Sequence, residues 1–286
     1  PKVLLKTFDQ LGFSADDLQR WEHMTRQTSG IILITGPTGS GKTSTLYATL
    51  KQLATPQVNL CTLEDPIEMI EPAFNQMQVQ PNIDLTFANG LRALLRQDPD
   101  IIMLGEIRDL ETAEMAIQAA LTGHLVLSTL HTNDAPSAIN RLQELGIAPY
   151  LIKAALLGVM AQRLVKTLCP ECKVEQPLTQ HDWQSFAADW HTSVPAHTCR
   201  AKGCQECRGS GYSGRAGVYE IMVMSDRLRA LIGPQTDVSA LRREACAEGM
   251  QPLRLAAASK VVAGLTSMEE ALRVTPEMRS RRPVNI

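Results

Sequence analysis

Aromatic rings, long apolar runs and charge of one sign are all scarce in this sequence of 286 residues. Aromatic residues make up 4% of the chain, so few rings are available for the base stacking that holds single-stranded nucleic acid. No apolar run approaches the ~18 residues that a membrane-spanning helix needs. With 28 basic and 30 acidic side chains the net charge is −2, which leaves no overall field to attract nucleic acid or anionic lipid. These absences disfavour a membrane-spanning protein and a nucleic-acid-binding protein.

The remaining composition is that of a chain with a buried core. Apolar residues account for 44% and charged residues for 20%, enough for one sizeable core or two smaller ones. Disordered and collagen-like chains are thereby excluded. The first residue is Pro1, and no secretory signal pattern follows it. We therefore expect an internal piece of a longer protein whose missing domain lies N-terminal to it.

Short apolar runs alternate with segments of helical period between residues 30 and 165. This alternation is typical of parallel strands that helices cover on both faces. It predicts an α/β fold with a mostly parallel sheet. The runs expected as strands are 31–34, 58–63, 101–104 and 125–130.

Outside that core the pattern changes several times. Ser14 with Asp17, and Ser267 with Glu270, have the spacing of capping boxes and predict helices that begin there. A long apolar helix is expected over about 150–168, and short amphipathic helices over 253–262 and 268–274. We expect a connector helix over 1–29, an α/β core of the nucleotide-binding type over 30–165, a cysteine-containing insert over 166–217, a helical C-terminal subdomain over 218–275 and a tail over 276–286.

A phosphate-binding loop follows the first expected strand. The pattern G-x-x-x-x-G-K-[ST] is complete and stands between a strand and a helix, which is the context that validates it. Its glycines let backbone N–H groups surround an anion, Lys42 reaches the β- and γ-phosphates, and the hydroxyl of Thr43 is the expected ligand of Mg²⁺. The nucleotide-binding residues are therefore expected to be Gly36, Pro37, Thr38, Gly39, Ser40, Gly41, Lys42, Thr43 and Ser44.

Two acidic residues are candidates for the catalytic carboxylate that such a loop requires at a neighbouring strand end. Glu106 follows the run 101–104 after Gly105, one residue later than usual, and Glu64 ends the preceding run. One can serve as base or water positioner and the other through water on Mg²⁺, and the sequence does not divide these roles. A solvated ion pair with Arg108 is the alternative for Glu106.

His124 and His131 bracket the strand expected over 125–130. His131 lies at its C-terminal end, where open α/β sheets bind ligands, and is our candidate γ-phosphate sensor. His124, at the opposite end, is the weaker candidate. For either residue the alternative is an ordinary structural histidine.

Four of the seven cysteines form two C-x-x-C pairs, with 31 residues between Cys172 and Cys204. Two such knuckles can close a tetrahedral zinc site with no open position, which predicts a structural metal. Two redox pairs or four unbound thiols are the alternatives. The expected zinc ligands are Cys169, Cys172, Cys204 and Cys207.

Taken together, these motifs resemble the C-terminal portion of the bacterial type II secretion and type IV pilus assembly ATPases, the traffic ATPases of the general secretory pathway E family. The resemblance runs from about residue 11 to 275. The retraction-type pilus motors resemble the same core but lack the tetracysteine insert. The motifs that carry the resemblance are GPTGSGKT at 36–43, CTLEDPIE at 61–68, DIIMLGEIRD at 100–109, TGHLVLSTLHTNDA at 122–135, AQRLVKTLCPEC at 161–172 and GCQECRGSGYSGRAGVYE at 203–220.

Membership of this family would imply a RecA-like P-loop NTPase fold, ring hexamers and ATP hydrolysis with Mg²⁺. It would also imply a cytoplasmic position, peripheral at an inner-membrane platform that assembles pili or pseudopili. The family's atypical acid falls on Glu106. Family members carry an N-terminal domain that supplies arginines to the nucleotide, and without it Arg92, Arg96 and Arg108 remain as basic groups here.

Two other functions stay open at this point. A RecA-like nucleic-acid translocase could use the zinc element as a grip, but it should show a basic groove with interleaved aromatics. A nucleotide-binding scaffold would keep the phosphate loop and lose turnover. ATP turnover measured with and without the missing N-terminal region separates these possibilities.

Overall fold

The computed structural model describes residues 6–187 and 194–276, which form two compact units. The first unit contains the residues up to 162 together with 220–250, and the second contains 163–219 together with the residues from 251 onward. The expected range 218–275 is thus divided between the units. The basic residues of the expected tail, Arg279, Arg281 and Arg282, lie outside the described residues. No helix within the described residues is long and apolar enough to cross a bilayer.

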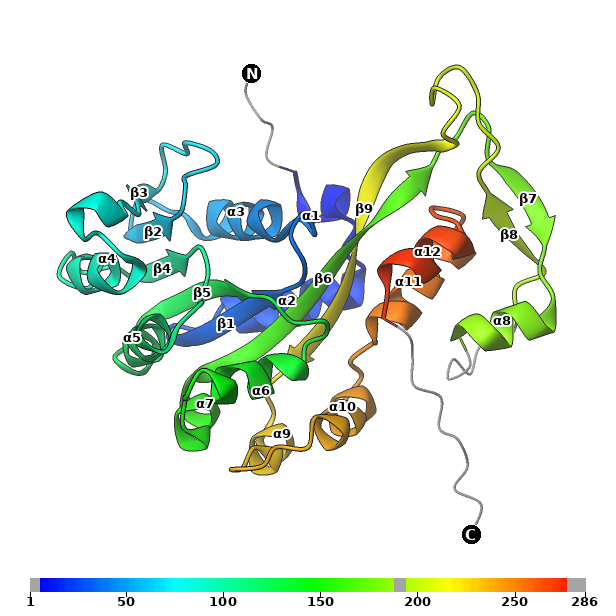
Figure 1. Cartoon of the computed structure of the whole chain (residues 1–286). Coiled ribbons are helices and arrows are strands. Elements are labelled where there is room, and N and C mark those ends of the chain that lie inside the picture. The colour runs from blue at the N-terminus through cyan, green and yellow to red at the C-terminus, as the bar shows by residue number, and fades with distance from the viewer. Residues whose placement is uncertain (1–5, 188–193, 277–286) are drawn as a thin grey trace, which may run out of the picture. The chain divides into compact units, whose positions relative to one another are not determined.

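A seven-stranded sheet organises the first unit, and its order is β3-β2-β4-β5-β1-β6-β9 (Figure 1). β1 pairs in parallel with β5 and β6, β4 with β2 and β5, and β2 with β3. The mostly parallel α/β fold is therefore confirmed. The strands are β1 (Gly30–Thr35), β2 (Leu60–Glu64), β3 (Asn75–Gln78), β4 (Ile101–Leu104), β5 (Leu125–Leu130), β6 (Leu156–Leu168) and β9 (Tyr212–Val223), the last two continuing into the second unit.

The central strands are buried along their whole length. Every residue of β1, β2, β4 and β5 is buried, as expected for parallel strands covered on both faces. The predicted strands 101–104 and 125–130 are confirmed with the same bounds, whereas β2 begins two residues later than expected. Because all these strands run the same way, their C-terminal ends meet at one edge of the sheet.

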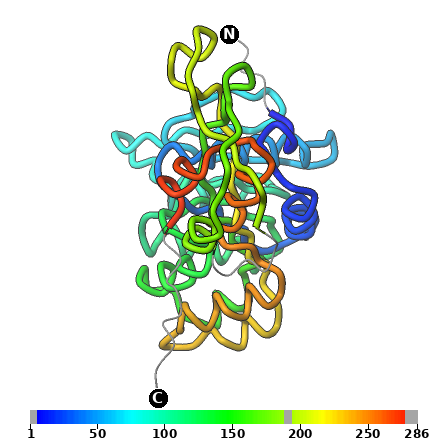
Figure 2. Tube along the Cα trace, turned by 90° about the vertical axis from the view of Figure 1, so that its right-hand side faces the viewer, coloured from blue at the N-terminus to red at the C-terminus, as the bar shows by residue number. Residues whose placement is uncertain are grey.

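Helices of the first unit connect and cover these strands. α4 packs on β2, and α5 packs on β1 and β5. Trp21 on the connector helix α2 is fully buried and donates a hydrogen bond to Thr49 Oγ1 at 2.9 Å, so α2 is part of this unit. The helices are α1 (Phe8–Leu11) and α2 (Ala15–Thr25), dark blue in Figure 2, then α3 (Lys42–Leu53), α4 (Phe87–Leu94), α5 (Leu110–Leu121), α6 (Ser137–Glu144), α7 (Pro149–Ala155), α9 (Asp226–Leu231) and α10 (Val238–Ala247), with a 3₁₀ turn at Pro81–Ile83.

Side-chain caps begin several helices where the sequence predicts them. The Ser14 hydroxyl accepts a hydrogen bond from Asp17 N, and the Asp17 side chain accepts one from Ser14 N, which is a complete capping box. The Ser267 hydroxyl likewise accepts a hydrogen bond from Glu270 N at 3.1 Å. These caps satisfy N–H groups that the first turn of a helix leaves unpaired.

The long helix expected over 150–168 is wrong. The chain forms α7 only as far as Ala155 and then the strand β6, which pairs with β1 from Ile31 onward. A continuous apolar run has no period that separates a buried strand from a buried helix. Gly158 in β6 allows the neighbouring strand β9 to approach closely. A Cβ at this position would lie 2.5 Å from the Met222 carbonyl oxygen, so only glycine fits there.

The second unit holds the cysteines. It contains the ends of β6 and β9, the antiparallel pair β7 (Val174–Pro177) and β8 (His197–Arg200), α8 (Gln180–Ala187), α11 (Leu253–Val262) and α12 (Met268–Val274). Both short C-terminal helices match the prediction. The return to helix expected just after residue 217 comes later, because β9 continues to Val223.

Candidate functional site

The phosphate loop occupies the turn between β1 and α3, at the C-terminal edge of the sheet. Gly39 and Gly41 have φ values of 76° and 87°, a left-handed conformation that side-chain-bearing residues rarely adopt. Lys42 Nζ donates to the carbonyl oxygens of Gly36 at 2.8 Å and Pro37 at 3.2 Å. The lysine therefore folds over its own loop, which places its ammonium group where an anion held by the loop would lie.

Two features of the loop fit a phosphate group. The Ser40 hydroxyl is buried and has no hydrogen-bond partner among the residues that the structure describes, so it is an unsatisfied polar group that needs explanation. Gly41, the N-cap of α3, offers no side-chain cap to the first N–H groups of that helix. A phosphate would accept hydrogen bonds at such a helix N-terminus. Thr43 lies half-buried on the first turn, where its hydroxyl could hold Mg²⁺ next to the phosphates.

The end of β1 is tied to the loop that follows β5. Thr132 N donates to Thr35 Oγ1 at 2.7 Å, and the two threonine hydroxyls lie 2.8 Å apart. Thr35 immediately precedes the phosphate loop, and Thr132 immediately follows His131. The histidine-containing loop is thus held beside the base of the phosphate loop.

Glu106 and His131 come together at this edge. His131 Nε2 lies 3.5 Å from Glu106 Oε2, and Thr129 Oγ1 donates to the Gly105 carbonyl oxygen at 2.7 Å, which joins the two strand ends. Glu106 also forms an ion pair with Arg108, the alternative considered above, and this hydrogen bond raises the pKa of the guanidinium. His131 is 52% exposed, so its imidazole remains accessible to a ligand. Acid and sensor candidates therefore share one site.

Glu64 ends β2 on the same edge but is engaged by protein donors. Its side chain is buried and accepts hydrogen bonds from Tyr47 at 2.7 Å, Thr62 at 2.6 Å and Gln76 at 3.2 Å. Burial and the adjacent Glu64 carboxylate raise the pKa of the Tyr47 phenol, which therefore stays a donor. These contacts fix the direction of the carboxylate. Its catalytic role stays a prediction.

Sequence reasoning missed Tyr47 as a partner of Glu64. The tyrosine lies on α3, the helix that begins at Lys42, and it is fully buried. A polar aromatic residue on the buried face of a phosphate-loop helix needs a hydrogen-bond partner, and this requirement is the signal that could have found it.

His124 lies away from the other candidates. It precedes β5, whereas His131 follows the same strand. Its Nδ1 lies 2.9 Å from the Ala119 carbonyl oxygen and 3.3 Å from the Thr122 hydroxyl, both at the end of α5. The structure does not bring His124 to the edge that carries the phosphate loop.

The arginines that the sequence offers as basic groups are placed differently from one another. Arg108 pairs with Glu106, as described. Arg92 forms an exposed ion pair with Glu111 at 2.7 Å, on α4 and α5. The structure therefore brings Arg108 to the site, and it pairs Arg92 with another helix.

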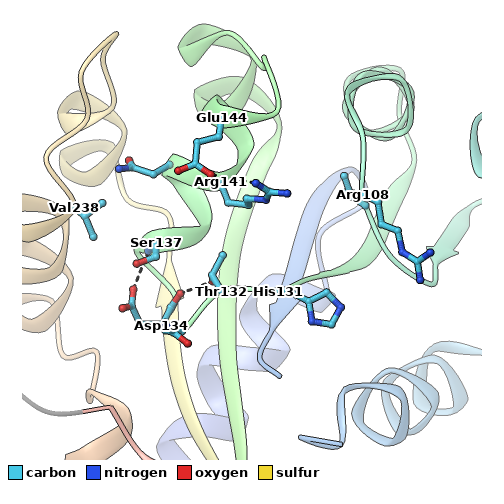
Figure 3. A pocket seen from close by; sticks show the side chains of 11 residues that line it. Arg108, His131, Thr132, Asp134, Ser137, Arg141, Glu144 and Val238 are labelled. Carbon is cyan, nitrogen blue, oxygen red and sulfur yellow. Dashed lines mark hydrogen bonds and ion pairs between the residues drawn. The ribbon is translucent and has the colours of Figure 1, made fainter. Parts of the chain in front are cut away.

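A polar pocket opens beside His131 (Figure 3). Its volume is about 530 Å³, and the residues lining it come from the ends of β4 and β5, from α6 and from α10. On α6, Arg141 forms an ion pair with Glu144 at 3.2 Å, and the side chain of Asp134 accepts a hydrogen bond from Ser137 N at 2.9 Å. The lining residues are Ile107, Arg108, His131, Thr132, Asn133, Asp134, Ser137, Asn140, Arg141, Glu144 and Val238.

The four predicted zinc ligands form a separate cluster in the second unit. The sulfur atoms of Cys169, Cys172, Cys204 and Cys207 all lie within 4.8 Å of one another, and all are free thiols. The Sγ–Sγ distance is 3.9 Å for Cys169 and Cys204, 3.7 Å for Cys172 and Cys207, and 3.7 Å for Cys204 and Cys207. Four thiolates around one Zn²⁺ at ~2.3 Å are ~3.8 Å apart, so the set fits a structural zinc site.

Backbone groups around this cluster favour a thiolate. Cys204 N and Gly211 N each donate to the sulfur of Cys207 at 3.1 Å. Burial opposes the charge, but these donors outweigh it and lower the pKa of Cys207 to about 6. Burial instead raises the pKa of Cys172 to about 11. A bound cation would deprotonate all four sulfurs, because a metal stabilises the thiolate form.

The mostly parallel sheet, the phosphate loop at its C-terminal edge and the acid and histidine on adjacent strand ends define a P-loop nucleotide-binding protein. Residues 2–273 match the family described as Type II/IV secretion system protein, and the chain belongs to it. The pilus retraction motor PilT with bound ADP has a similar structure, with a TM-score of 0.69 and 28% identity over 96% of this chain and 68% of that one. The Legionella pneumophila ATPase DotB, at 24% identity, shares the fold with a TM-score of 0.68, over 94% of this chain and 64% of its own.

Curated relatives are more similar in sequence. The chain is 57% identical to the type IV pilus assembly ATPase TfpB of Acinetobacter baylyi, over 96% of this chain and 47% of the relative. It is 48% identical to the type II secretion system ATPase E of Vibrio cholerae, over 93% of this chain and 52% of the relative. The chain thus spans about half the length of these relatives. The family includes ATPases of both secretion and pilus assembly.

Proposed function

We propose that this chain is the ATP-hydrolysing part of a motor that powers type IV pilus assembly or type II protein secretion. The observation that carries the proposal is the meeting of three elements at one sheet edge. The phosphate loop, Glu106 and His131 lie at the ends of β1, β4 and β5, which are adjacent in the sheet. A phosphate loop with a carboxylate and a polar sensor on neighbouring strands is the arrangement that phosphoryl transfer to water requires.

Each element has a distinct role in the proposal. The loop N–H groups, the Ser40 hydroxyl and Lys42 bind the phosphates of ATP, and Thr43 holds Mg²⁺, which neutralises phosphate charge when bound. Glu106 accepts a proton from the attacking water or orients it. His131 contacts the γ-phosphate side of the site and distinguishes ATP from ADP.

The supporting groups have subsidiary roles. Glu64, held by Tyr47, acts on Mg²⁺ through water. His124 holds the N-terminal end of β5 to α5 and supports the sheet rather than touching nucleotide. The cysteine cluster binds one Zn²⁺, which orders the second unit and takes no part in hydrolysis.

The surroundings of the motor are proposed from what the family resemblance implies. We infer a ring hexamer that docks on inner-membrane platform proteins, is peripheral to that membrane on the cytoplasmic side and acts with an N-terminal domain of the same protein. Nucleic acid is not an expected partner, because the net charge is −2 and aromatic residues make up 4% of the chain. The higher identity to the pilus relative, 57% against 48%, makes pilus assembly the first assignment to test.

The test is ATP turnover by the full-length protein with and without Mg²⁺, in the wild type and in Lys42→Ala. We expect Mg²⁺-dependent phosphate release that Lys42→Ala abolishes, together with loss of stabilisation by MgATP in a thermal shift. Lys51→Ala is the matched control, because Lys51 lies on the same helix and forms an ion pair with Glu71. Nucleotide binding without turnover would support the scaffold instead, and an unchanged thermal shift in Lys42→Ala would overturn the nucleotide site.

A further inference from the structure

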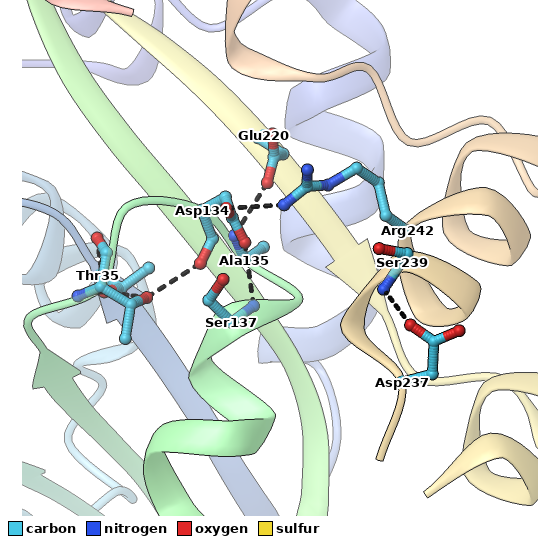
Figure 4. A network of polar contacts seen from close by, with 9 residues as sticks. Thr35, Asp134, Ala135, Ser137, Glu220, Asp237, Ser239 and Arg242 are labelled. Carbon is cyan, nitrogen blue, oxygen red and sulfur yellow. Dashed lines mark hydrogen bonds and ion pairs between the residues drawn. The ribbon is translucent and has the colours of Figure 1, made fainter. Parts of the chain in front are cut away.

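The segment that follows β5, residues 131–136, is anchored at both ends. At its start Thr132 N donates to Thr35 Oγ1 at 2.7 Å, which ties it to the base of the phosphate loop. At its end Ala135 N donates to Glu220 Oε1 on β9 at 2.8 Å (Figure 4). These bonds tie Thr132 to β1 and Ala135 to β9, and a third contact holds Asp134, which lies between them.

Asp134 makes that third contact. Arg242 on α10 donates from Nη2 to Asp134 Oδ2 at 2.7 Å, which is a charge-assisted hydrogen bond (Figure 4). The other carboxylate oxygen accepts from Ser137 N at 2.9 Å, and the Asp134 carbonyl oxygen accepts from Thr132 Oγ1 at 2.8 Å. Asp134 therefore connects the start of the segment, the first turn of α6 and α10.

The ion pair is unevenly exposed. The side chain of Asp134 is 15% exposed and that of Arg242 is 41% exposed. Without the guanidinium, a mostly buried carboxylate would keep only the Ser137 N–H as a donor. Removing one partner of a largely buried pair leaves an uncompensated charge, so we expect the Asp134 carboxylate to turn toward water and to shift its own backbone.

His131 is the residue that such a movement would displace. It directly precedes Thr132, whose hydroxyl donates to the Asp134 carbonyl oxygen at 2.8 Å, so a movement of Asp134 reaches it through Thr132. The side chain of His131 is 52% exposed, and its Nε2 lies 3.5 Å from Glu106 Oε2. A half-exposed side chain has little packing of its own to hold it. Its placement beside Glu106 therefore follows the backbone of the segment.

We propose that Arg242 is a positioning residue for ATP hydrolysis: by binding Asp134 it holds the 131–136 segment so that His131 stays beside Glu106. This inference rests on the proposed function. Arg242 lies on α10, 108 positions along the chain from Asp134. In this proposal it affects turnover through His131.

An ordinary structural ion pair would behave differently. Loss of a purely structural pair should lower the melting temperature and leave kcat at the wild-type level. A positioning role instead predicts a loss of kcat of ~10- to 100-fold, the range seen when a reacting group is misplaced by its supporting contacts. The KM for ATP should stay within ~3-fold, because the phosphate loop is untouched.

The experiment compares Arg242→Gln with Arg243→Gln in the full-length protein. Arg243 is the next residue on the same helix. Its Nη2 lies 3.8 Å from Asp237 Oδ2, a long distance for an ion pair, and both side chains are exposed. We expect kcat to fall only in Arg242→Gln, and Arg242→Lys to recover part of it. Asp134→Asn tests the same contact from the other side. If Arg242→Gln or Asp134→Asn unfolds the protein, or if both variants retain wild-type kcat, the proposal is overturned.

A double mutant separates action through His131 from a general effect. In a His131→Ala background, Arg242→Gln should lower kcat no further, and a full additional loss would contradict the proposal. Hydrogen exchange without nucleotide should rise at residues 131–136 in Arg242→Gln and not in Arg243→Gln. If the wild type shows no more turnover than Lys42→Ala, the proposed function fails. The exchange result then still decides whether Arg242 holds the segment.

Discussion

Tyr47 Oη lies 2.7 Å from Glu64 Oε2, so the helix that follows the phosphate loop is hydrogen-bonded to the acid at the end of β2. Both groups are buried, and Tyr47 also donates toward the Met69 carbonyl oxygen at 3.0 Å. A shift of α3 would therefore move Glu64 as well. This contact links the element that binds phosphate to the second acid of the site.

Tyr47→Phe should lower the free energy of unfolding by ~1–3 kcal/mol, because a buried carboxylate loses one of its donors. Urea unfolding of the two proteins measures the change. Tyr150→Phe is the control, since Tyr150 is 68% exposed and its loss of a hydroxyl should have no effect. Equal stability of Tyr47→Phe and wild type would show that the hydrogen bond is not formed in solution.

Glu106→Gln should retain MgATP binding and lose turnover by ~10²-fold or more, the scale expected when a positioned base or water orienter is removed. Binding is measured by thermal shift and turnover by phosphate release. Glu111→Gln, on an exposed side chain paired with Arg92, should leave both unchanged. Equal loss of binding and turnover would make Glu106 mainly a metal-site residue, and near wild-type turnover would pass the catalytic role to Glu64.

Cys204→Ser should remove zinc without removing nucleotide binding. The cysteines lie in the second unit and the phosphate loop in the first, so loss of the metal should increase hydrogen exchange around the cysteines while residues 36–43 still bind ATP. Elemental analysis should find one zinc per wild-type chain and less in the mutant. Cys199→Ser, in the same unit but outside the cluster, should keep the metal. Zinc-free wild-type protein with a Cys169–Cys172 disulfide would contradict the structural-zinc assignment.

Glu270 should make stability depend on pH. Burial opposes its charge, but hydrogen bonds from Arg273 and from Lys166 N outweigh burial and lower the pKa of the carboxyl. Because the folded-state pKa lies below the unfolded value of ~4.3, the stabilisation is complete above that pH and is lost as the pH falls through the folded-state pKa.

Glu270→Gln should therefore destabilise the protein at pH 7, and its difference from wild type should shrink as the pH falls from ~4.3 toward ~2. Unfolding measured between these values checks the trend. Glu269→Gln, at the exposed neighbouring position on α12, should have no such effect. A difference between Glu270→Gln and wild type that does not change with pH would contradict the assignment of the lowered pKa.

Local chemistry in the sequence was enough to predict several parts of this protein. The phosphate-loop pattern, the paired cysteines and the helix caps at Ser14 and Ser267 depend on residues a few positions apart, so no distant partner is needed to recognise them. The strands 101–104 and 125–130 were predictable because apolar runs bounded by polar turns are long enough for a strand and too short for a helix.

Tertiary structure decided what depends on distant partners. The run 156–168 is a strand because β1 pairs with it, whereas its own apolar pattern suits a buried helix equally well. Tyr47 is Glu64's partner, and Arg242 is Asp134's, because folding brings together side chains 17 and 108 positions apart. The sequence shows that a buried charged or polar side chain will need a hydrogen-bond partner, but only the folded chain determines which group lies within hydrogen-bonding distance.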